Sequence, residues 1–136
     1  MWRALLVIAL LHLSQPATAL QFTCLQYGPL QIVGMLVQHT YAGPPDYESV
    51  TKGDAPLTVW KLQLDERICV DANTRYPREL IQIEIELALT PEQYRQYRPL
   101  LGQKVRVTGE LKHGGASHQK PLVIEPDDLQ KTSLVP

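Results

Sequence analysis

Large aliphatic side chains alternate with polar ones from Leu80 to Leu89. In an extended chain Ile83 and Ile85 point to one side, and Glu84 and Glu86 point to the other. This period of two predicts a β-strand with one face in a core. A shift of one residue in the strand pairing would expose the whole aliphatic set, so the alternation also specifies the register. We expect one inward-facing row made of Ile81, Ile83, Ile85, Leu87 and Leu89.

Four further segments have the composition of strands. The first is long and carries Gly34 near its middle, where a glycine marks a bend that lets one strand serve two sheets of a barrel. In the second, Trp60 and Leu62 face inward, whereas Lys61 is expected on a solvated exterior with Lys104 and Arg106. The predicted strands are Leu30–Tyr41, Leu57–Leu64, Leu80–Leu89, Gln103–Leu111 and Pro121–Ile124.

One short helix is expected directly after the third strand. Thr90 suits the N-cap, Pro91 suits the first helical position, and Gln93 completes a capping box with Thr90. Pro99 and Gly102 end the helix. Its apolar face, which would close one end of a barrel, consists of Tyr94, Tyr97 and Leu101.

The order of these elements is three strands, a helix and two strands. That order is typical of the OB-fold, so we expect a mainly β chain forming a small five-stranded OB-like Greek-key barrel with one helix between strands three and four. The alternative is a small β-sandwich that carries one helix.

The first residues predict export. Arg3 precedes an apolar stretch from Ala4 to Leu13, and Ala17-Thr18-Ala19 matches the small-x-small pattern of signal-peptide cleavage sites. The stretch is far shorter than the roughly 20 residues that span a bilayer, which disfavours a membrane anchor. We expect a signal peptide at 1–19 cleaved after Ala19, a periplasmic or secreted domain at 20–126 that does not insert into membranes, and a frayed tail at 127–136.

The chain has two cysteines, Cys24 and Cys69, and both follow the expected cleavage site. An even number of cysteines in an exported chain predicts one disulfide. A metal or redox pair is the alternative, and it is disfavoured because the two residues are far apart and form no C-x-x-C motif.

Several short motifs are similar to those of a bacterial family, the domain of unknown function 4431 (DUF4431). The specific ones are Gly43-Pro44-Pro45-x-Tyr47-Glu48-Ser49-Val50 and the two cysteines, and the resemblance runs from about Cys24 to about Ile124. It implies an exported proteobacterial protein and no particular activity. Members tend to carry a histidine-rich stretch after strand four, of which His113 and His118 remain here.

Charge and motifs exclude several function classes. The formal net charge of −1 disfavours a nucleic-acid partner, which requires an excess of Lys and Arg on one face. The chain has no G-x-S-x-G or H-E-x-x-H motif and no Ser/His/Asp arrangement with a usable signature. We therefore expect a chain that is not an enzyme and that requires no cofactor.

The segment 43–54 is the candidate binding loop. It joins strands one and two, a connection that commonly contacts ligands in OB-folds. The candidate binding residues are Asp46, Tyr47, Glu48 and Asp54. In the alternative interpretation, this loop folds back on the barrel with the Tyr47 side chain packed and its hydroxyl bonded.

These features predict a monomeric periplasmic binding module. Its partner would be an envelope protein or glycan, and inhibition of an envelope protein, or an accessory role to one, is a concrete form of this hypothesis. The alternative function is a metal-binding envelope stress protein that uses loop histidines. His113 and His118 are its weak candidates, with His39 as a further ligand, because zinc requires three or four ligands in close geometry.

Overall fold

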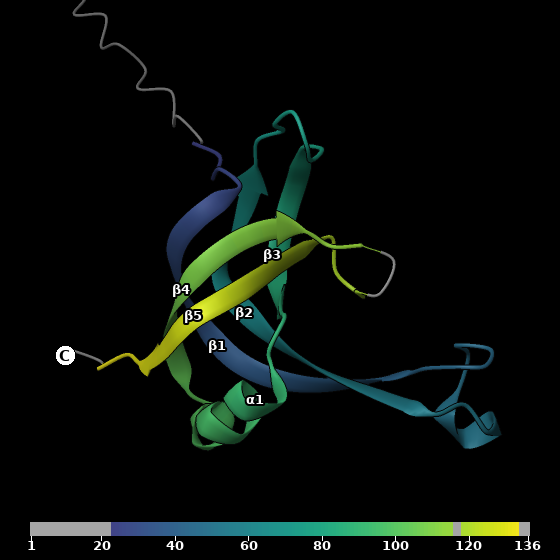
Figure 1. The fold of residues 1–136 in the computed structure, drawn as a ribbon. Coiled ribbons are helices and arrows are strands. Elements are labelled where there is room, and N and C mark those ends of the chain that lie inside the picture. The colour runs from purple at the N-terminus through teal and green to yellow at the C-terminus, as the bar shows by residue number, and fades with distance from the viewer. Residues whose placement is uncertain (1–22, 116–117, 134–136) are drawn as a thin grey trace, which may run out of the picture.

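The computed structural model describes residues 23–115 and 118–133. This part of the chain is mainly β, with five strands and one short α-helix (Figure 1). The expected fold class is confirmed at this level. The elements are β1 Gly28–Ala42, η1 Val50–Lys52, β2 Pro56–Val70, β3 Glu79–Leu87, α1 Pro91–Tyr97, η2 Arg98–Leu100, β4 Lys104–His113 and β5 Leu122–Lys131, where η1 and η2 are 3₁₀ turns.

The strands form one closed sheet in the order β1-β2-β3-β5-β4, and β4 pairs with β1 again. Four of the five pairings are antiparallel. The fifth joins β3 to β5 in parallel, and it is short, with Glu86 opposite Val123 and Leu87 opposite Ile124. The N-terminal half of β3 therefore extends past the start of β5.

β1 serves two neighbours, as its central glycine predicts. Residues Gly28–Met35 pair with β4, and residues Met35–Ala42 pair with β2. Gly34 lies where the partner changes, and a Cβ atom there would lie 2.6 Å from the backbone oxygen of Gln63. A larger residue would force the two strands apart, so glycine permits the close crossing that the bend requires.

The pairing of β2 with β3 is irregular. Between the pairs Ile68–Gln82 and Val70–Glu79, β3 takes one more residue than β2, which is a β-bulge at Leu80 and Ile81. Ile81 has a φ of 56°, a conformation that is unusual for a β-branched residue.

The expected inward row of β3 is therefore wrong in its first half. Ile81 is 67% exposed and Ile83 is 46% exposed, whereas Ile85 and Leu87 are buried as predicted. The bulge interrupts the alternation at Ile81. Ile83 keeps the parity of Ile85, but it lies on the half of β3 that has no β5 partner, so no strand on that side helps to cover it.

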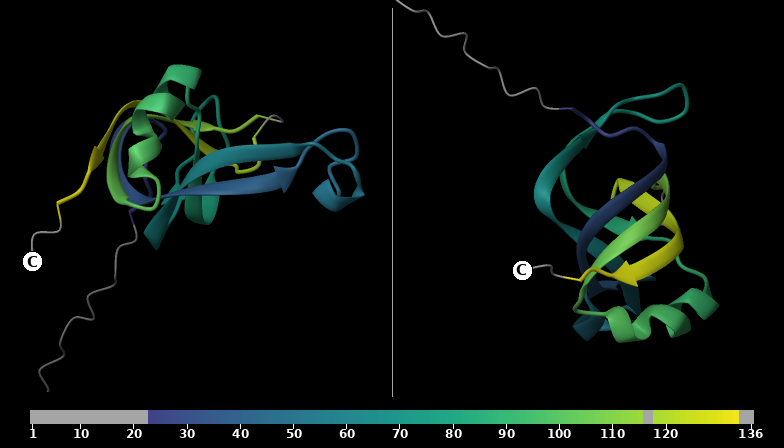
Figure 2. Two further views of the ribbon diagram at one scale, coloured as in Figure 1. Left: turned by 90° about the horizontal axis from the view of Figure 1, so that it is seen from below. Right: turned by 90° about the vertical axis from the view of Figure 1, so that its left-hand side faces the viewer.

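The core fills the closed sheet, and α1 lies across one end of it (Figure 2). The capping box of Thr90 and Gln93 is present as predicted. Trp60 packs edge-on against Tyr94 with ring centroids 5.0 Å apart. The predicted apolar helix face is confirmed for Tyr97, which is buried, and for Tyr94, which packs against the core. Leu101 also packs against the core, but it follows η2 and so lies outside the helix.

The predicted end of the domain is wrong. β5 runs to Lys131, and its residues pair with β4 up to the pair Val105–Lys131. Leu129, within the supposedly frayed segment, is only 4% exposed. The pairing is interrupted near Asp127, between Thr108 and Gly109 on the partner strand. This irregularity breaks the alternation of side chains, so the sequence pattern does not predict that the strand continues. Residues 134–136 lie outside the described part, as does the predicted signal peptide at 1–19.

No helix in residues 23–115 and 118–133 is both long and apolar enough to cross a membrane.

Candidate functional site

The candidate binding loop, residues 43–54, projects from the closed sheet at the end of the β1–β2 hairpin (Figures 1 and 2). The hairpin remains paired up to Ala42 and Pro56. Beyond that pair, the backbone N–H of Gly43 donates to the oxygen of Ala55 at 2.6 Å, and the N–H of Ala55 donates to the oxygen of Pro44 at 2.8 Å. The base of the loop therefore continues the ladder of the hairpin.

A single buried carboxylate holds the middle of this loop. Asp54 is 6% exposed. One of its oxygens accepts from the backbone N–H of Asp46 at 3.0 Å, and the other accepts from those of Glu48 at 2.8 Å and Ser49 at 2.9 Å. Three donors that would otherwise lack partners are satisfied by one side chain, which orders the loop.

These bonds also set the charge state of Asp54. The backbone N–H groups of Ser49, Asp46 and Glu48 stabilise the carboxylate, and they lower the pKa of Asp54 below its ordinary value although burial opposes them. The aspartate therefore remains ionised at neutral pH and keeps accepting all three bonds.

Tyr47 is presented outward by the ordered loop. Its side chain is 62% exposed. Its φ is 58°, a left-handed conformation that costs a non-glycine residue about 1–3 kcal/mol and persists only where surrounding contacts fix it. One such contact is the bond from the N–H of Tyr47 to the oxygen of Gly43 at 3.0 Å. The alternative interpretation, with Tyr47 packed against the sheet, does not agree with this exposure.

The four candidate residues thus have different positions. Asp54 is buried and organises the loop, whereas Asp46, Tyr47 and Glu48 lie on its exposed surface. The loop brings these residues together, and their role in binding a partner stays a prediction.

A half-buried ionic network, which the sequence pattern does not predict, lies on the outer face of β2 and β3. Lys61 is 8% exposed, contrary to the expected solvated exterior. Its ammonium lies 2.8 Å from one oxygen of Glu84, and Lys120 contacts the other oxygen. Burial raises the pKa of Glu84, but the hydrogen bonds and charges of Lys120 and Lys61 outweigh it, so the pKa is lowered overall.

A second carboxylate on β3 fixes the loop between β4 and β5. Glu86 is 4% exposed. It lies 2.9 Å from Nδ1 of His118 and accepts from the backbone N–H groups of Gln119 at 2.9 Å and Lys120 at 3.3 Å. Glu86, His118 and Tyr94 also line a cavity of about 660 Å³. Both oxygens of Glu86 accept hydrogen bonds from the loop between β4 and β5 or contact its histidine, so this carboxylate holds the loop against β3.

Each histidine of the metal hypothesis contacts a different partner. His113 Nε2 lies 2.9 Å from Glu79, His118 bonds Glu86, and His39 packs against Tyr41 with ring centroids 4.3 Å apart. Across residues 23–115 and 118–133, no group of three His, Cys, Asp or Glu side chains is placed to hold a metal ion.

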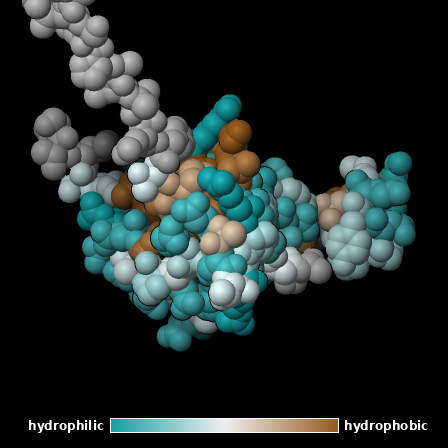
Figure 3. All heavy atoms as spheres, turned by 90° about the horizontal axis from the view of Figure 1, so that it is seen from above, coloured by the Kyte–Doolittle hydropathy of each residue, from teal (hydrophilic) through white to brown (hydrophobic). Residues whose placement is uncertain are grey.

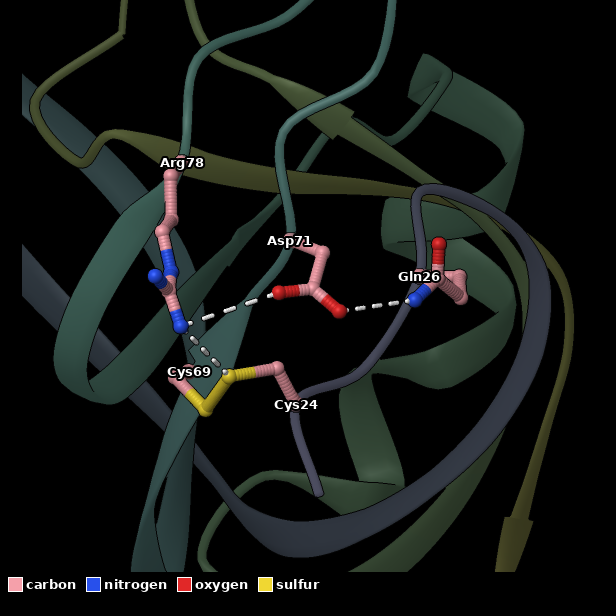
Figure 4. The surroundings of a disulfide bond; sticks show 5 residues. All are labelled: Cys24, Gln26, Cys69, Asp71 and Arg78. Atoms are coloured by element: carbon pink, nitrogen blue, oxygen red, sulfur yellow. Dashed lines mark hydrogen bonds and ion pairs between the residues drawn. A yellow bond between two sulfur atoms is a disulfide. The ribbon is translucent and has the colours of Figure 1, made fainter. Parts of the chain in front are cut away.

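The predicted disulfide between Cys24 and Cys69 is confirmed, with 4.7 Å between the Cα atoms. It fixes the segment before β1 beside the end of β2, where the N–H of Leu25 donates to the oxygen of Cys69 at 2.8 Å. Figure 4 shows Arg78 beside this bond, with one guanidinium nitrogen 3.7 Å from Cys24 Sγ and 3.8 Å from the Asp71 carboxylate.

Fold and loop together define a small disulfide-bonded, mainly β protein with a projecting, internally ordered loop. Residues 84–129 match the family model described as Domain of unknown function (DUF4431), so the resemblance expected from the sequence is confirmed over this part of the chain. The matched segment contains Glu84, Glu86, His113 and His118, whereas the loop 43–54 and the cysteines lie outside it. No curated protein matches the chain.

Proposed function

We propose that this chain is an exported binding module of the bacterial envelope, that it is not an enzyme, and that it engages a protein or glycan through the loop 43–54. The observation that carries the proposal is the exposed ring of Tyr47 on a loop ordered by Asp54. A loop that is already ordered loses little conformational entropy when it binds, so more of the contact energy remains as affinity. Tyrosine suits such a contact because its ring is large and rigid and its hydroxyl remains polar.

The proposal includes an OB-like Greek-key barrel. Three observations support it: the closed order β1-β2-β3-β5-β4, the parallel contact of β3 with β5, and the helix between β3 and β4. In OB-folds the loops that join strands one to two and four to five flank the ligand-binding face. Here the first of these loops carries Tyr47, and the ionic network of Lys61, Glu84 and Lys120 fixes the second to the face.

Export to the periplasm is also part of the proposal. A paired disulfide is compatible with a secreted protein, since such bonds persist in oxidising compartments. The apolar stretch before Ala17-Thr18-Ala19 is typical of a signal peptide. Intact-mass analysis of the protein recovered from the periplasm should give a chain that begins at Leu20, and an uncleaved chain retained in the cytoplasm would contradict this part.

Affinity capture from envelope extract tests the binding role. The tagged, oxidised chain should retain one discrete partner, either a protein identified by mass spectrometry or a glycan identified by composition. Tyr47→Ala should abolish retention and Tyr47→Phe should preserve most of it, since the ring provides most of the contact area. Lys52→Ala, on the same loop, is the matched control. If Tyr47→Ala retained the partner unchanged and kept its fold, the loop would be excluded as the binding site.

A further inference from the structure

A second surface lies on β3, around the bulge. Leu80 is 59% exposed, Ile81 is 67% exposed and Ile83 is 46% exposed, so three large aliphatic side chains within four residues face solvent. Figure 3 looks onto the molecule from above the view of Figure 1 and shows apolar surface gathered on this face. Natural sheets rarely leave such a group uncovered, and an exposed aliphatic group of this kind marks an interaction site.

The backbone of this segment also lacks a strand partner on one side. Among the described residues, β5 joins β3 only at Glu86 and Leu87, and β2 occupies the other edge. The carbonyl of Leu80 accepts a hydrogen bond from the side-chain amide of Gln82 at 3.2 Å. Edge strands that must stay unpaired usually carry charged side chains. This edge has a bulge, which hinders pairing, but its exposed side chains are aliphatic and not charged. The aliphatic side chains favour pairing with an extended segment.

Charge defines what the segment must carry. Arg67 and Arg78 line an apolar groove of about 420 Å³ together with Leu80, Ile81 and both cysteines. Arg78 faces the carboxylate of Asp71 at 3.8 Å, but this pair is exposed and weak. Arg67 has no ion pair among the described residues. Two guanidinium groups at the rim of an aliphatic groove complement a chain that combines aliphatic side chains with carboxylates.

We propose that the N-terminal half of β3 binds an extended, acidic and aliphatic segment of a partner protein by strand addition. The backbone of the segment would pair with the free edge, its aliphatic side chains would cover Leu80 and Ile81, and its carboxylates would meet Arg67 and Arg78. This mode of recognition derives affinity from main-chain bonds and specificity from alternate side chains. The surface is separate from the loop 43–54, so the inference stands independently of the function proposed above.

A peptide titration followed by NMR tests this inference. The probes are two short peptides in which valine and threonine alternate, one with glutamate at both ends and one with lysine, added to the isotope-labelled, disulfide-bonded chain from the periplasm. The acidic peptide should shift the amide signals of residues 80–83 and bind about tenfold or more tightly than the basic one. Ile81→Ser should weaken binding about tenfold. Val50→Ser, at a residue 44% exposed on the loop 43–54, should not.

A charge-reversal variant gives the more specific test of the charge preference. The double substitution Arg67→Glu with Arg78→Glu should reverse the preference, so that the lysine peptide binds more tightly. Equal binding of the two peptides, or no shifts with millimolar acidic peptide, would overturn the inference. It would also be overturned if the aliphatic group mediated self-association in sedimentation experiments, or if it bound vesicles of anionic phospholipid but no peptide. Tyr47→Ala should change none of these results, which separates this test from that of the proposed function.

Discussion

The carboxylate of Asp54 accepts a hydrogen bond from the backbone N–H of Ser49 at 2.9 Å, within the loop that carries Tyr47. Replacing this aspartate by asparagine removes the charge and one acceptor oxygen, while the shape is kept. We expect Asp54→Asn to leave the sheet folded but to increase amide hydrogen exchange at Asp46, Glu48 and Ser49. Glu48→Gln, on the exposed surface of the same loop, is the control. Unchanged protection in Asp54→Asn would show that the carboxylate does not order the loop.

The order of this loop should also depend on pH in a defined direction. The pKa of Asp54 is lowered in the folded chain by the N–H groups of Ser49, Asp46 and Glu48. The stabilisation from Asp54 is therefore fully present above the unfolded value of about 3.9, and it is lost as the pH falls through the lower folded value. An NMR titration should give a midpoint for this carboxyl below that of an exposed aspartate. A midpoint at or above the ordinary value would contradict the bonding scheme.

The ionic network of Lys61, Glu84 and Lys120 should stabilise the fold in a pH-dependent way. Glu84→Gln leaves the buried ammonium of Lys61 without its partner, and it should lower the free energy of unfolding by about 1–3 kcal/mol at neutral pH. Because the pKa of Glu84 is lowered in the folded state, the difference between the wild type and this variant should shrink as the pH falls below the usual glutamate range. Urea unfolding at several pH values measures it, with the exposed Glu110→Gln as control.

Because of the bulge on β3, substitutions of Ile81 and Ile85 should have different effects on stability. Ile85 is fully buried, so Ile85→Ala should lower the free energy of unfolding by about 2–5 kcal/mol. Ile81 is exposed and holds a φ of 56°, a conformation that glycine adopts without strain. Ile81→Gly should therefore be neutral or slightly stabilising. A large loss of stability in Ile81→Gly would mean that Ile81 faces the core after all.

The disulfide should contribute strongly to stability. Its two cysteines are 45 residues apart, and closing a loop of this length destabilises the unfolded chain by about 4 kcal/mol in the chain-entropy model. Replacing both cysteines by serine should lower the urea midpoint accordingly. A midpoint equal to that of the oxidised wild type would show that the bond is dispensable.

Local sequence signals predict much of this fold. The capping box of Thr90 and Gln93, the bend at Gly34 and the pairing of the two cysteines each depend on chemistry within a few residues or on an even cysteine count. The structure confirms all three.

Other features depend on long-range pairing, so local sequence patterns do not predict them. The exposure of Ile81 follows from a bulge that only the register with β2 defines, and the exposure of Ile83 follows from where β5 begins. Lys61 has the alternation of a solvent-facing residue, yet it is buried and paired with Glu84, which Lys120 also contacts. The loop 43–54 is recognisable by its composition, but the role of Asp54 as its organiser depends on backbone geometry that composition does not specify.

The central claim is that the ordered loop presents Tyr47 to a partner in the cell envelope. Site-specific photo-crosslinking in living cells tests it most directly, with a benzophenone amino acid placed at position 47 and, for comparison, at position 106 on the exposed face of β4. We predict one discrete crosslinked species from position 47 and none from position 106. If position 47 gave no adduct, or the same adducts as position 106, the claim would be contradicted.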